Sequence, residues 1–169
     1  MQIMETERIV MREFTEEDAG LIYDLLNSPG WLKHIGQRGI KGEEDARGYI
    51  ENLIMPGYEK HGYGFYLMIR KDDGAHLGMC GLINRDTLDD VDIGFAILPE
   101  YEGNGYTTEA ALATMEFAKN EIGLKRIAAI TVPYNSSSIR ILEKLGMKFE
   151  KMINIPNDSE DLMLYVREF

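Results

Sequence analysis

The chain has 169 residues, of which 44% are hydrophobic, and this balance argues against both a disordered chain and a membrane protein. Lys and Arg number 18 against 29 Asp and Glu, so the net charge is −11 and nucleic acid is not an expected partner. Such acidity is common among soluble proteins, although it would also suit a cationic partner such as an amine or a basic peptide.

The first part of the chain predicts a strand followed by two helices. Thr15 is a suitable N-cap, and Asp18 three residues later completes a capping-box pattern. The stretch SPGW, Ser28–Trp31, breaks the helix that follows. The second helix is amphipathic, and we expect the stretch PGYEKHG to end it. The expected elements are a strand at Glu7–Phe14 and helices at 15–27 and Gly42–Met55.

The hydrophobic period then changes to two, which predicts an antiparallel meander. The Asp73-Gly74 pair is typical of a hairpin turn, and Pro99 stops the last strand of the meander. The expected strands are Tyr63–Arg70, His76–Ile83 and Val91–Leu98.

The rest of the chain alternates between strands and helices. Gly123 and Gly146 stand where helices end, and Asn135 is a good N-cap. We therefore expect one α/β (α+β) domain over 1–169, a meander followed by a β-α-β-α-β unit. Its later elements are helices at Thr107–Ile122 and Asn135–Gly146 and strands at Arg126–Val132, 147–153 and 161–169, the last two around a turn at 156–159.

A glycine-rich turn lies between the meander and the next helix, in PEYEGNGYTTEA at 99–110. Gly103 and Gly105 allow several backbone N–H groups at a helix start to point at one anion. A Walker loop is excluded because no Lys follows Gly105. A dinucleotide fingerprint is weak, since Thr108 replaces its third glycine and no acid follows Val132. A plain turn and the pyrophosphate site of an acyl-CoA transferase both remain open.

Two longer motifs carry a family resemblance: DIGFAILPEYEGNGYTTEA, followed by VPYNSSSIRILEKLGMKFE. In this order and spacing they resemble the GNAT N-acetyltransferase superfamily, and its branch of ribosomal-protein N-terminal acetyltransferases, which includes polyamine and other small-amine relatives. The resemblance runs from RIVMREFTEEDA near the start to LMLYVREF at the end. It implies a single-domain GNAT-like fold with a mixed seven-stranded sheet and about four helices. The sheet would be splayed open near Ile97, with acetyl-CoA in the gap.

The resemblance also implies a set of cofactor residues. Glu102 and Asn104 stand where the branch commonly has an aromatic residue and Lys or Arg, so we expect backbone groups to hold the phosphates. The pantetheine arm would pair with the strand before the turn, and the helix after the next strand would contact the arm or the thioester. The expected cofactor-binding residues are Phe95, Ala96, Ile97, Glu102, Gly103, Asn104, Gly105, Tyr106, Thr107, Thr108, Asn135 and Ser138.

Four residues are candidates for catalysis. Acyl transfer to an amine needs a base for the amine, a donor for the oxyanion and an acid for the departing thiolate. Ser138 is the first candidate acid and Tyr134 the second, while Asn135 would position the arm or the substrate and a backbone N–H near Ile97 would serve the oxyanion. Asp92 is the candidate base, although an exposed strand acid is an equal alternative. By residue type alone, Asn135 is a plain N-cap and Ser138 a solvated serine.

The implied activity is acetyl-CoA-dependent N-acetylation of a primary amine, either a peptide or protein N-terminus or a small amine. A polyamine or antibiotic-type acetyltransferase and a non-catalytic acyl-CoA-binding or sensing domain remain alternatives. Cys80 is the lone cysteine, so we expect a cytoplasmic protein without internal disulfides, membrane association or a metal. Both a monomer and a homodimer are open, because the apolar strand with Leu162, Leu164 and Val166 could pair between subunits or lie in the sheet.

Overall fold

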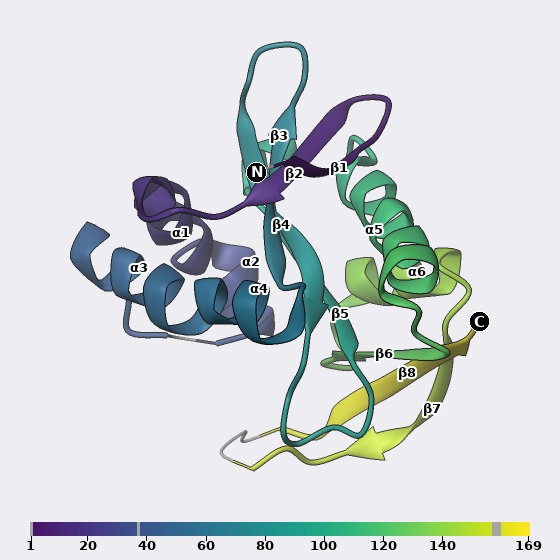
Figure 1. The fold of residues 1–169 in the computed structure, drawn as a ribbon. Coiled ribbons are helices and arrows are strands. Elements are labelled where there is room, and N and C mark those ends of the chain that lie inside the picture. The colour runs from purple at the N-terminus through teal and green to yellow at the C-terminus, as the bar shows by residue number, and fades with distance from the viewer. Residues whose placement is uncertain (1, 37, 157–159) are drawn as a thin grey trace.

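The fold is built on one mixed sheet (Figure 1), in a computed structural model that describes residues 2–36, 38–156 and 160–169. Eight strands within these ranges follow the order β1-β2-β3-β4-β5-β6-β8-β7. Neighbouring strands are antiparallel except β5 and β6, which are parallel. The strands are β1 Gln2–Glu5, β2 Ile9–Glu13, β3 Phe65–Arg70, β4 His76–Ile83, β5 Asp92–Ile97, β6 Arg126–Thr131, β7 Lys148–Ile153 and β8 Leu162–Glu168.

The predicted α/β architecture is confirmed, but the sheet has one more strand than the seven expected. The additional strand is β1, which pairs with β2 as a hairpin, and the N–H of Thr6 closes the turn by donating to the carbonyl of Ile9 at 2.8 Å. Only four residues form β1, of which the two polar ones, Gln2 and Glu5, are exposed and Met4 is buried. So short and polar a segment carries little periodicity of its own, and the pairing with β2 makes it a strand.

Helices cover both faces of the sheet (Figure 1). The helices α1 to α4 pack around a core that includes Phe14, Leu25 and Leu67, whereas α5 packs on the opposite face over Met68 and Cys80. Leu67 and Met68 are neighbours on β3, so their side chains enter different cores. The helices are α1 Ala19–Leu26, α2 Pro29–His34, α3 Glu43–Tyr49, α4 Met55–His61, α5 Tyr106–Phe117 and α6 Ser136–Lys144.

Two helix predictions need correction. The expected break at SPGW is real, but Pro29 also begins α2, since a proline at the first helical position loses no intrahelical hydrogen bond. The second expected helix is longer than Gly42–Met55: α3 continues through a π-helical turn, Ile50–Ile54, into α4, which runs through PGYEKHG and stops at its last residue, Gly62, with φ +82°. Pro56 directly follows the π-helical turn, at the start of α4.

Other local predictions are confirmed. Thr15 and Asp18 form the expected capping box, in which the N–H of Thr15 donates to the carboxylate of Asp18 at 2.9 Å. Gly123 ends the helical run after α5 with φ +80°, in the left-handed conformation that favours glycine. Of the expected turn at 156–159, residues 157–159 lie outside the described residues.

The last strand lies inside the sheet, between β6 and β7. Leu164 pairs with Ile130 of β6 and Val166 with Ala128. The strand could have paired between subunits or joined the sheet of its own chain, and the structure has it in the sheet of its own chain. In the described parts of the chain, no helix combines the length and apolarity needed to span a membrane.

Candidate active site

The parallel pair β5 and β6 opens a gap in the sheet. Asp92, the first residue of β5, stands opposite Ala128 in the middle of β6, and this is the position at which the two strands are paired. Beyond it the strands diverge along the rest of β5. The resemblance placed the opening near Ile97, and in the structure it begins five residues earlier, at Asp92. The closed end of the gap is therefore at Asp92, and the open end is at the glycine-rich turn.

Backbone groups of both strands face this gap. The N–H of Leu98 donates across to β4, whereas the carbonyl of Val91 accepts from β6. Because hydrogen-bonding direction alternates along an antiparallel pair, the N–H and C=O groups of Phe95 and Ile97 point away from β4 and toward β6. By the same alternation, Ile130 of β6 presents its own groups to the gap. The strands thus offer hydrogen-bonding edges to an extended amide-containing chain.

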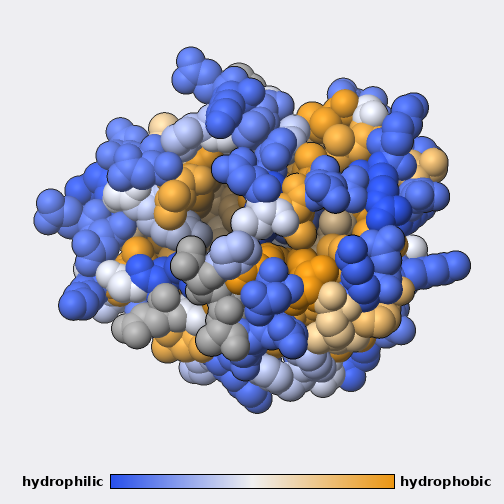
Figure 2. All heavy atoms as spheres, turned by 90° about the horizontal axis from the view of Figure 1, so that it is seen from below, coloured by the Kyte–Doolittle hydropathy of each residue, from blue (hydrophilic) through white to orange (hydrophobic). Residues whose placement is uncertain are grey.

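The gap is part of a cleft of about 1800 Å³ that is lined by α2, β5, β6, the glycine-rich turn and α6. Seen from below, the molecule is hollowed, with hydrophobic residues inside the hollow and hydrophilic residues around it (Figure 2). The lining includes α2, a segment whose sequence predicted a break at Ser28–Trp31 and not a helix.

The glycine-rich turn forms one end of the cleft. Gly103 and Gly105 both have φ +80°, a conformation that a residue with a side chain adopts at a cost. The first helical hydrogen bond of α5 runs from the N–H of Glu109 to the carbonyl of Gly105 at 3.1 Å. The N–H groups of the three preceding residues therefore have no partner within the helix, and with the helix dipole they suit an anion.

An arginine from the β1–β2 hairpin braces this turn. The Nε of Arg8 lies 2.8 Å from the carboxylate of Glu109, and its Nη1 donates to the carbonyl of Asn104 at 2.9 Å. Its guanidinium carbon also lies 4.4 Å from the ring centroid of Tyr106. No local pattern in the sequence predicts this contact, because about a hundred residues separate the partners.

Most of the expected cofactor residues line the cleft, with one exception. Asn104 is absent from the lining, since its side-chain amide donates back to the carbonyls of Tyr101 and Glu102 at 3.3 and 3.2 Å. Asn104 thus stabilises the turn from within. The expected residues that do line the cleft are Phe95, Ala96, Ile97, Glu102, Gly103, Gly105, Tyr106, Thr107, Thr108, Asn135 and Ser138.

Basic side chains also line the cleft from α6. Arg140 and Lys144 are exposed, four residues apart on this helix, and both border the cleft. The family resemblance drew attention to the turn itself, at Glu102 and Asn104, and did not indicate this basic pair. Arg140 and Lys144 are four residues apart in the helix that Asn135 caps, and this spacing was the available signal, because it places both on one helix face.

The start of α6 brings two candidate catalytic residues together. The side-chain oxygen of Asn135 accepts a hydrogen bond from the N–H of Ser138 at 3.2 Å, so Asn135 is an N-cap as its residue type predicts. Ser138 is half-buried and lines the cleft, and within the described ranges its hydroxyl has no hydrogen-bond partner. That hydroxyl is available to a bound molecule.

Tyr134 lies at the rim of the cleft and is already engaged. Its hydroxyl lies 2.8 Å from one carboxylate oxygen of Glu160 and 3.3 Å from the carbonyl of Lys33 on α2. The side chain is 48% exposed, and its ring lies 5.8 Å from that of His34. Tyr134 therefore links α2 to the segment before β8.

Asp92 occupies the closed end of the cleft and is 1% exposed, so the alternative of an exposed strand acid does not hold. The Nε of Arg85 lies 3.1 Å from one of its oxygens. Burial raises the pKa of the Asp92 carboxyl to about 6, against the opposing charge of Arg85. A carboxyl with this pKa is poised to exchange protons near neutral pH.

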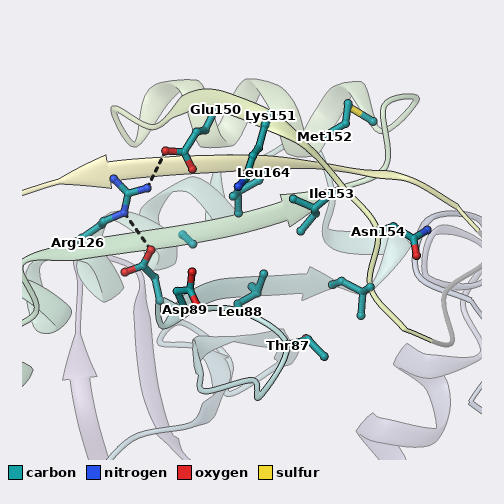
Figure 3. A pocket seen from close by; sticks show the side chains of 13 residues that line it. Thr87, Leu88, Asp89, Arg126, Glu150, Lys151, Met152, Ile153, Asn154 and Leu164 are labelled. Atoms are coloured by element: carbon teal, nitrogen blue, oxygen red, sulfur yellow. Dashed lines mark hydrogen bonds and ion pairs between the residues drawn. The ribbon is translucent and has the colours of Figure 1, made fainter.

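A smaller cavity of about 380 Å³ lies beside β6, β7 and the loop before β5 (Figure 3). Arg126 crosses its mouth and pairs with Asp90 and Glu150, both at 2.9 Å. These carboxylates balance the guanidinium charge, so the cavity holds an ion-pair network. Over residues 2–36, 38–156 and 160–169, no three side chains of the metal-binding types come together.

Comparisons with known proteins agree with this geometry. A family model described as an acetyltransferase (GNAT) domain matches residues 8–148. The uncharacterized N-acetyltransferase YnaD of Bacillus subtilis (strain 168) is 30% identical over 159 residues, which cover 92% of this chain and 89% of YnaD.

Solved structures share the fold. A GNAT-family acetyltransferase from Bacillus anthracis is 27% identical, with a TM-score of 0.80 over 99% of this chain and 98% of that one. RimL, a ribosomal L7/L12 α-N-protein acetyltransferase solved with coenzyme A, is 15% identical, with a TM-score of 0.83 over 99% and 98% of the two chains. The family model covers most of the sequence, and the chain belongs to the GNAT family of acetyltransferases.

Proposed function

We propose that this protein binds acetyl-CoA in the cleft between β5 and β6 and transfers the acetyl group to a primary amine, with the whole chain acting as one acetyltransferase domain. The observation that carries the proposal is the pairing of these strands at Asp92 alone among the described residues of β5. It leaves a row of backbone groups along β5 that leads from a buried carboxylate to an anion-binding helix start.

The residues of the cleft fit both the pantetheine arm and the pyrophosphate of acetyl-CoA. The N–H and C=O groups of Phe95 and Ile97 suit the amides of a pantetheine arm, which would extend β5 as an added strand edge. The N–H groups at the start of α5 suit the pyrophosphate, and Arg140 and Lys144 add positive charge to the same cleft. RimL, with the same fold, was solved with coenzyme A, which supports this choice of ligand.

Acetyl-CoA supplies the acetyl group as an activated thioester, and this chain's residues supply proton transfer and orientation. Asp92 accepts the proton of the acceptor amine, directly or through water, because its pKa near 6 leaves it ionised at neutral pH. A backbone N–H of β5 that faces the gap donates to the developing oxyanion. Ser138 donates its hydroxyl proton to the departing sulfur and regains a proton from water in the cleft that it lines, with Tyr134 as the second candidate acid.

The acceptor in this proposal is a peptide or protein N-terminus or a small amine. The ribosomal L7/L12 acetyltransferase RimL supports the first of these by its fold. The rival function is a non-catalytic acyl-CoA-binding or sensing domain, which would bind the same ligand in the same cleft.

The test begins with binding. Trp31 is the single tryptophan and lines the cleft, so its fluorescence reports ligand entry alongside calorimetry. We expect acetyl-CoA to bind and NAD, the control, not to bind. Release of CoA with an amine then separates an enzyme from a sensing domain, whereas no binding of acetyl-CoA would contradict the proposal.

A further inference from the structure

The strand residues next to Asp92 on its face of the sheet are apolar. Ile83 of β4 is paired directly opposite Asp92 of β5. Directly paired residues of neighbouring strands point to the same face, so the Ile83 side chain lies beside the carboxyl. Gly94, two residues further along β5, faces the same way. A molecule that reaches Asp92 along this face therefore meets hydrocarbon.

An aromatic ring lies over the same place. Phe65 of β3 pairs with Gly81 of β4, which in turn pairs with Gly94 of β5. Neither glycine carries a side chain, and the Phe65 ring reaches along this row. A Cβ atom built on Gly94 would lie 3.2 Å from two carbons of the ring and 3.1 Å from Cδ1 of Ile83. Phe65, Ile83 and Gly94 all line the cleft, so its sheet side near Asp92 is apolar.

Helices α2 and α3 cover this face of the sheet. Trp31 of α2 is buried in a hydrophobic cluster, and Tyr49 of α3 and Phe65 pack against that cluster. All three side chains also line the cleft. Aromatic side chains from the sheet and from both helices therefore wall the cleft on the side that Asp92 faces.

Exposed apolar side chains extend this wall. Leu53 belongs to the π-helical turn between α3 and α4 and is 70% exposed. The carbonyl oxygen of the next residue, Ile54, lies 3.7 Å from a Cβ atom built on Gly64, which places the turn beside the start of β3. Leu53 lines the cleft, as do the exposed Leu32 and Ile35 of α2. Exposed apolar groups gathered in a cleft are typical of a ligand-binding site.

The cleft disfavours additional positive charge. Among the described residues that line it, five Lys and Arg side chains stand against three acids, although the net charge of the chain is −11. Asp92 is already paired with Arg85, and the other two acids belong to the glycine-rich turn and to the segment before β8. A second ammonium group near Asp92 would leave water for apolar surroundings, which is costly without a counter-charge. The cations are Lys33, Arg38, Arg85, Arg140 and Lys144, and the acids are Asp92, Glu102 and Glu160.

We propose that the acceptor amine carries one large apolar group, and that Phe65, Ile83 and Leu53 contact this group while the amine is held near Asp92. The inference rests on the proposed acetyltransferase function and narrows its substrate class. The apolar group can be the first side chain of a peptide or the hydrocarbon part of a small amine, and the test distinguishes these sources. A polyamine is a poor acceptor, because it places a second charge among the apolar side chains.

The test compares matched acceptors of nearly equal size that differ in polarity. One pair is phenethylamine and its pyridyl analogue, and the other is the tripeptide amides leucyl-alanyl-alanine and asparaginyl-alanyl-alanine, with spermidine as the cationic acceptor. CoA release is followed for each. We expect kcat/KM to be at least about tenfold higher for the apolar member of one pair, a discrimination that hydrophobic pockets reach. The pair that shows the preference identifies the source.

Variants of the apolar wall connect the preference to the site. Leu53→Gln should lower the preference about threefold by raising KM for the apolar acceptor, with acetyl-CoA affinity unchanged. Leu112→Gln makes the same substitution at an exposed leucine of α5 outside the cleft lining and should keep the preference.

A second variant predicts a gain, which partial unfolding would not produce. Phe65→Leu removes the ring that lies over Gly94 and leaves room for a larger group. We expect kcat/KM to rise for a bulkier acceptor relative to the preferred one, with naphthylethylamine compared with phenethylamine, or the tryptophanyl peptide with the leucyl peptide.

Three results would overturn the inference while leaving the acetyltransferase function intact: equal or higher rates for the polar member of both pairs, a preference for spermidine over both apolar acceptors, or an apolar preference that neither Leu53→Gln nor Phe65→Leu alters. Failure of the function itself looks different. It would appear as no acetyl-CoA binding, or as no CoA release with any acceptor, and it would overturn both.

Discussion

The Nε of Arg85 lies between the two carboxylate oxygens of Asp92, at 3.1 and 3.3 Å, where β5 and β6 begin to separate. The contact joins the loop after β4 to the first residue of β5, at the closed end of the cleft. Burial disfavours the charge of Asp92 and Arg85 favours it, and burial dominates, so the pKa lies at about 6. The site thus holds a carboxylate that changes its charge close to neutral pH.

The first prediction concerns the pH dependence of activity. Only the ionised form of Asp92 can accept a proton, so kcat/KM should rise as the pH passes through about 6 and then level off. Asp92→Asn should lower kcat/KM by about 100-fold, at the lower end of typical acid–base contributions, and remove this inflection. Asp89→Asn, at an exposed position three residues away, is the control and should keep the profile. An Asp92→Asn protein with the wild-type profile would exclude Asp92 as the base.

The same group affects stability in a defined direction. Folding raises the pKa of Asp92 from 3.8 to about 6, so the folded protein holds this proton more tightly than the unfolded chain does. This difference adds to the free energy of unfolding at low pH. That contribution is lost as the pH rises through about 6. Urea unfolding at pH 4.5 and 7.5 should therefore show a smaller loss of unfolding free energy in Asp92→Asn than in the wild-type protein. An equal loss in both proteins would count against the raised pKa.

The third prediction separates the two candidate acids. Ser138→Ala should lower turnover at least about tenfold, because the departing sulfur loses its proton donor, while acetyl-CoA affinity is nearly unchanged. Ser136→Ala at the start of the same helix, outside the cleft lining, is the matched control. If Ser138→Ala has full activity and Tyr134→Phe does not, the tyrosine is the acid despite its contact with Glu160.

The fourth prediction tests the glycine-rich turn with a matched pair of glycines. Gly103 has φ +80° and Gly74, in the β3–β4 hairpin, has φ +74°, and a Cβ atom would meet no heavy atom within 4 Å at either position. Gly103→Ala and Gly74→Ala should each cost about 1–2 kcal/mol of unfolding free energy, because alanine is strained in this conformation. Only Gly103→Ala should also weaken acetyl-CoA binding. Equal affinities for acetyl-CoA in the two variants would exclude this turn as the phosphate-binding site.

The fifth prediction tests the cationic pair on α6. Arg140→Gln combined with Lys144→Gln should weaken acetyl-CoA binding, and the difference from the wild-type protein should shrink between 50 mM and 500 mM salt, since exposed charges are screened over about 10 Å at 0.1 M. Lys148→Gln, an exposed position on β7 outside the cleft lining, should leave the affinity unchanged. An effect of the double variant that persists in high salt would indicate a packing role.

Much of the fold could be predicted because its signals are local. Alternating residues identified the meander, Thr15 and Asp18 the start of the first helical segment, and Gly123 the end of another. The elements that were missed depend on contacts with other segments. Strand β1 needs its hairpin neighbour β2 as a partner, and in α4, past Pro56, Tyr58 stacks on Tyr66 of β3 and accepts a hydrogen bond from the N–H of Phe14.

The candidate site shows the same division. The glycine-rich turn and the N-cap Asn135 could be predicted from the sequence, since a positive φ and a helix cap depend on single residues and their neighbours. The brace between Arg8 and Glu109 and the contact of Tyr134 with the carbonyl of Lys33 on α2 left no such trace. Each joins segments separated by tens of residues, and side-chain charge alone does not reveal which segments meet.

Residue order is enough to predict the fold class, the family resemblance, and the turn and helix start that suit a phosphate, because these follow from periodicity and from residue-specific backbone preferences. Only the folded chain shows where β5 and β6 part, that Asp92 is buried there with a raised pKa, and that the cleft is cationic in a chain of net charge −11. Burial and local potential depend on what surrounds a group in space, and the order of residues along the chain does not specify those surroundings.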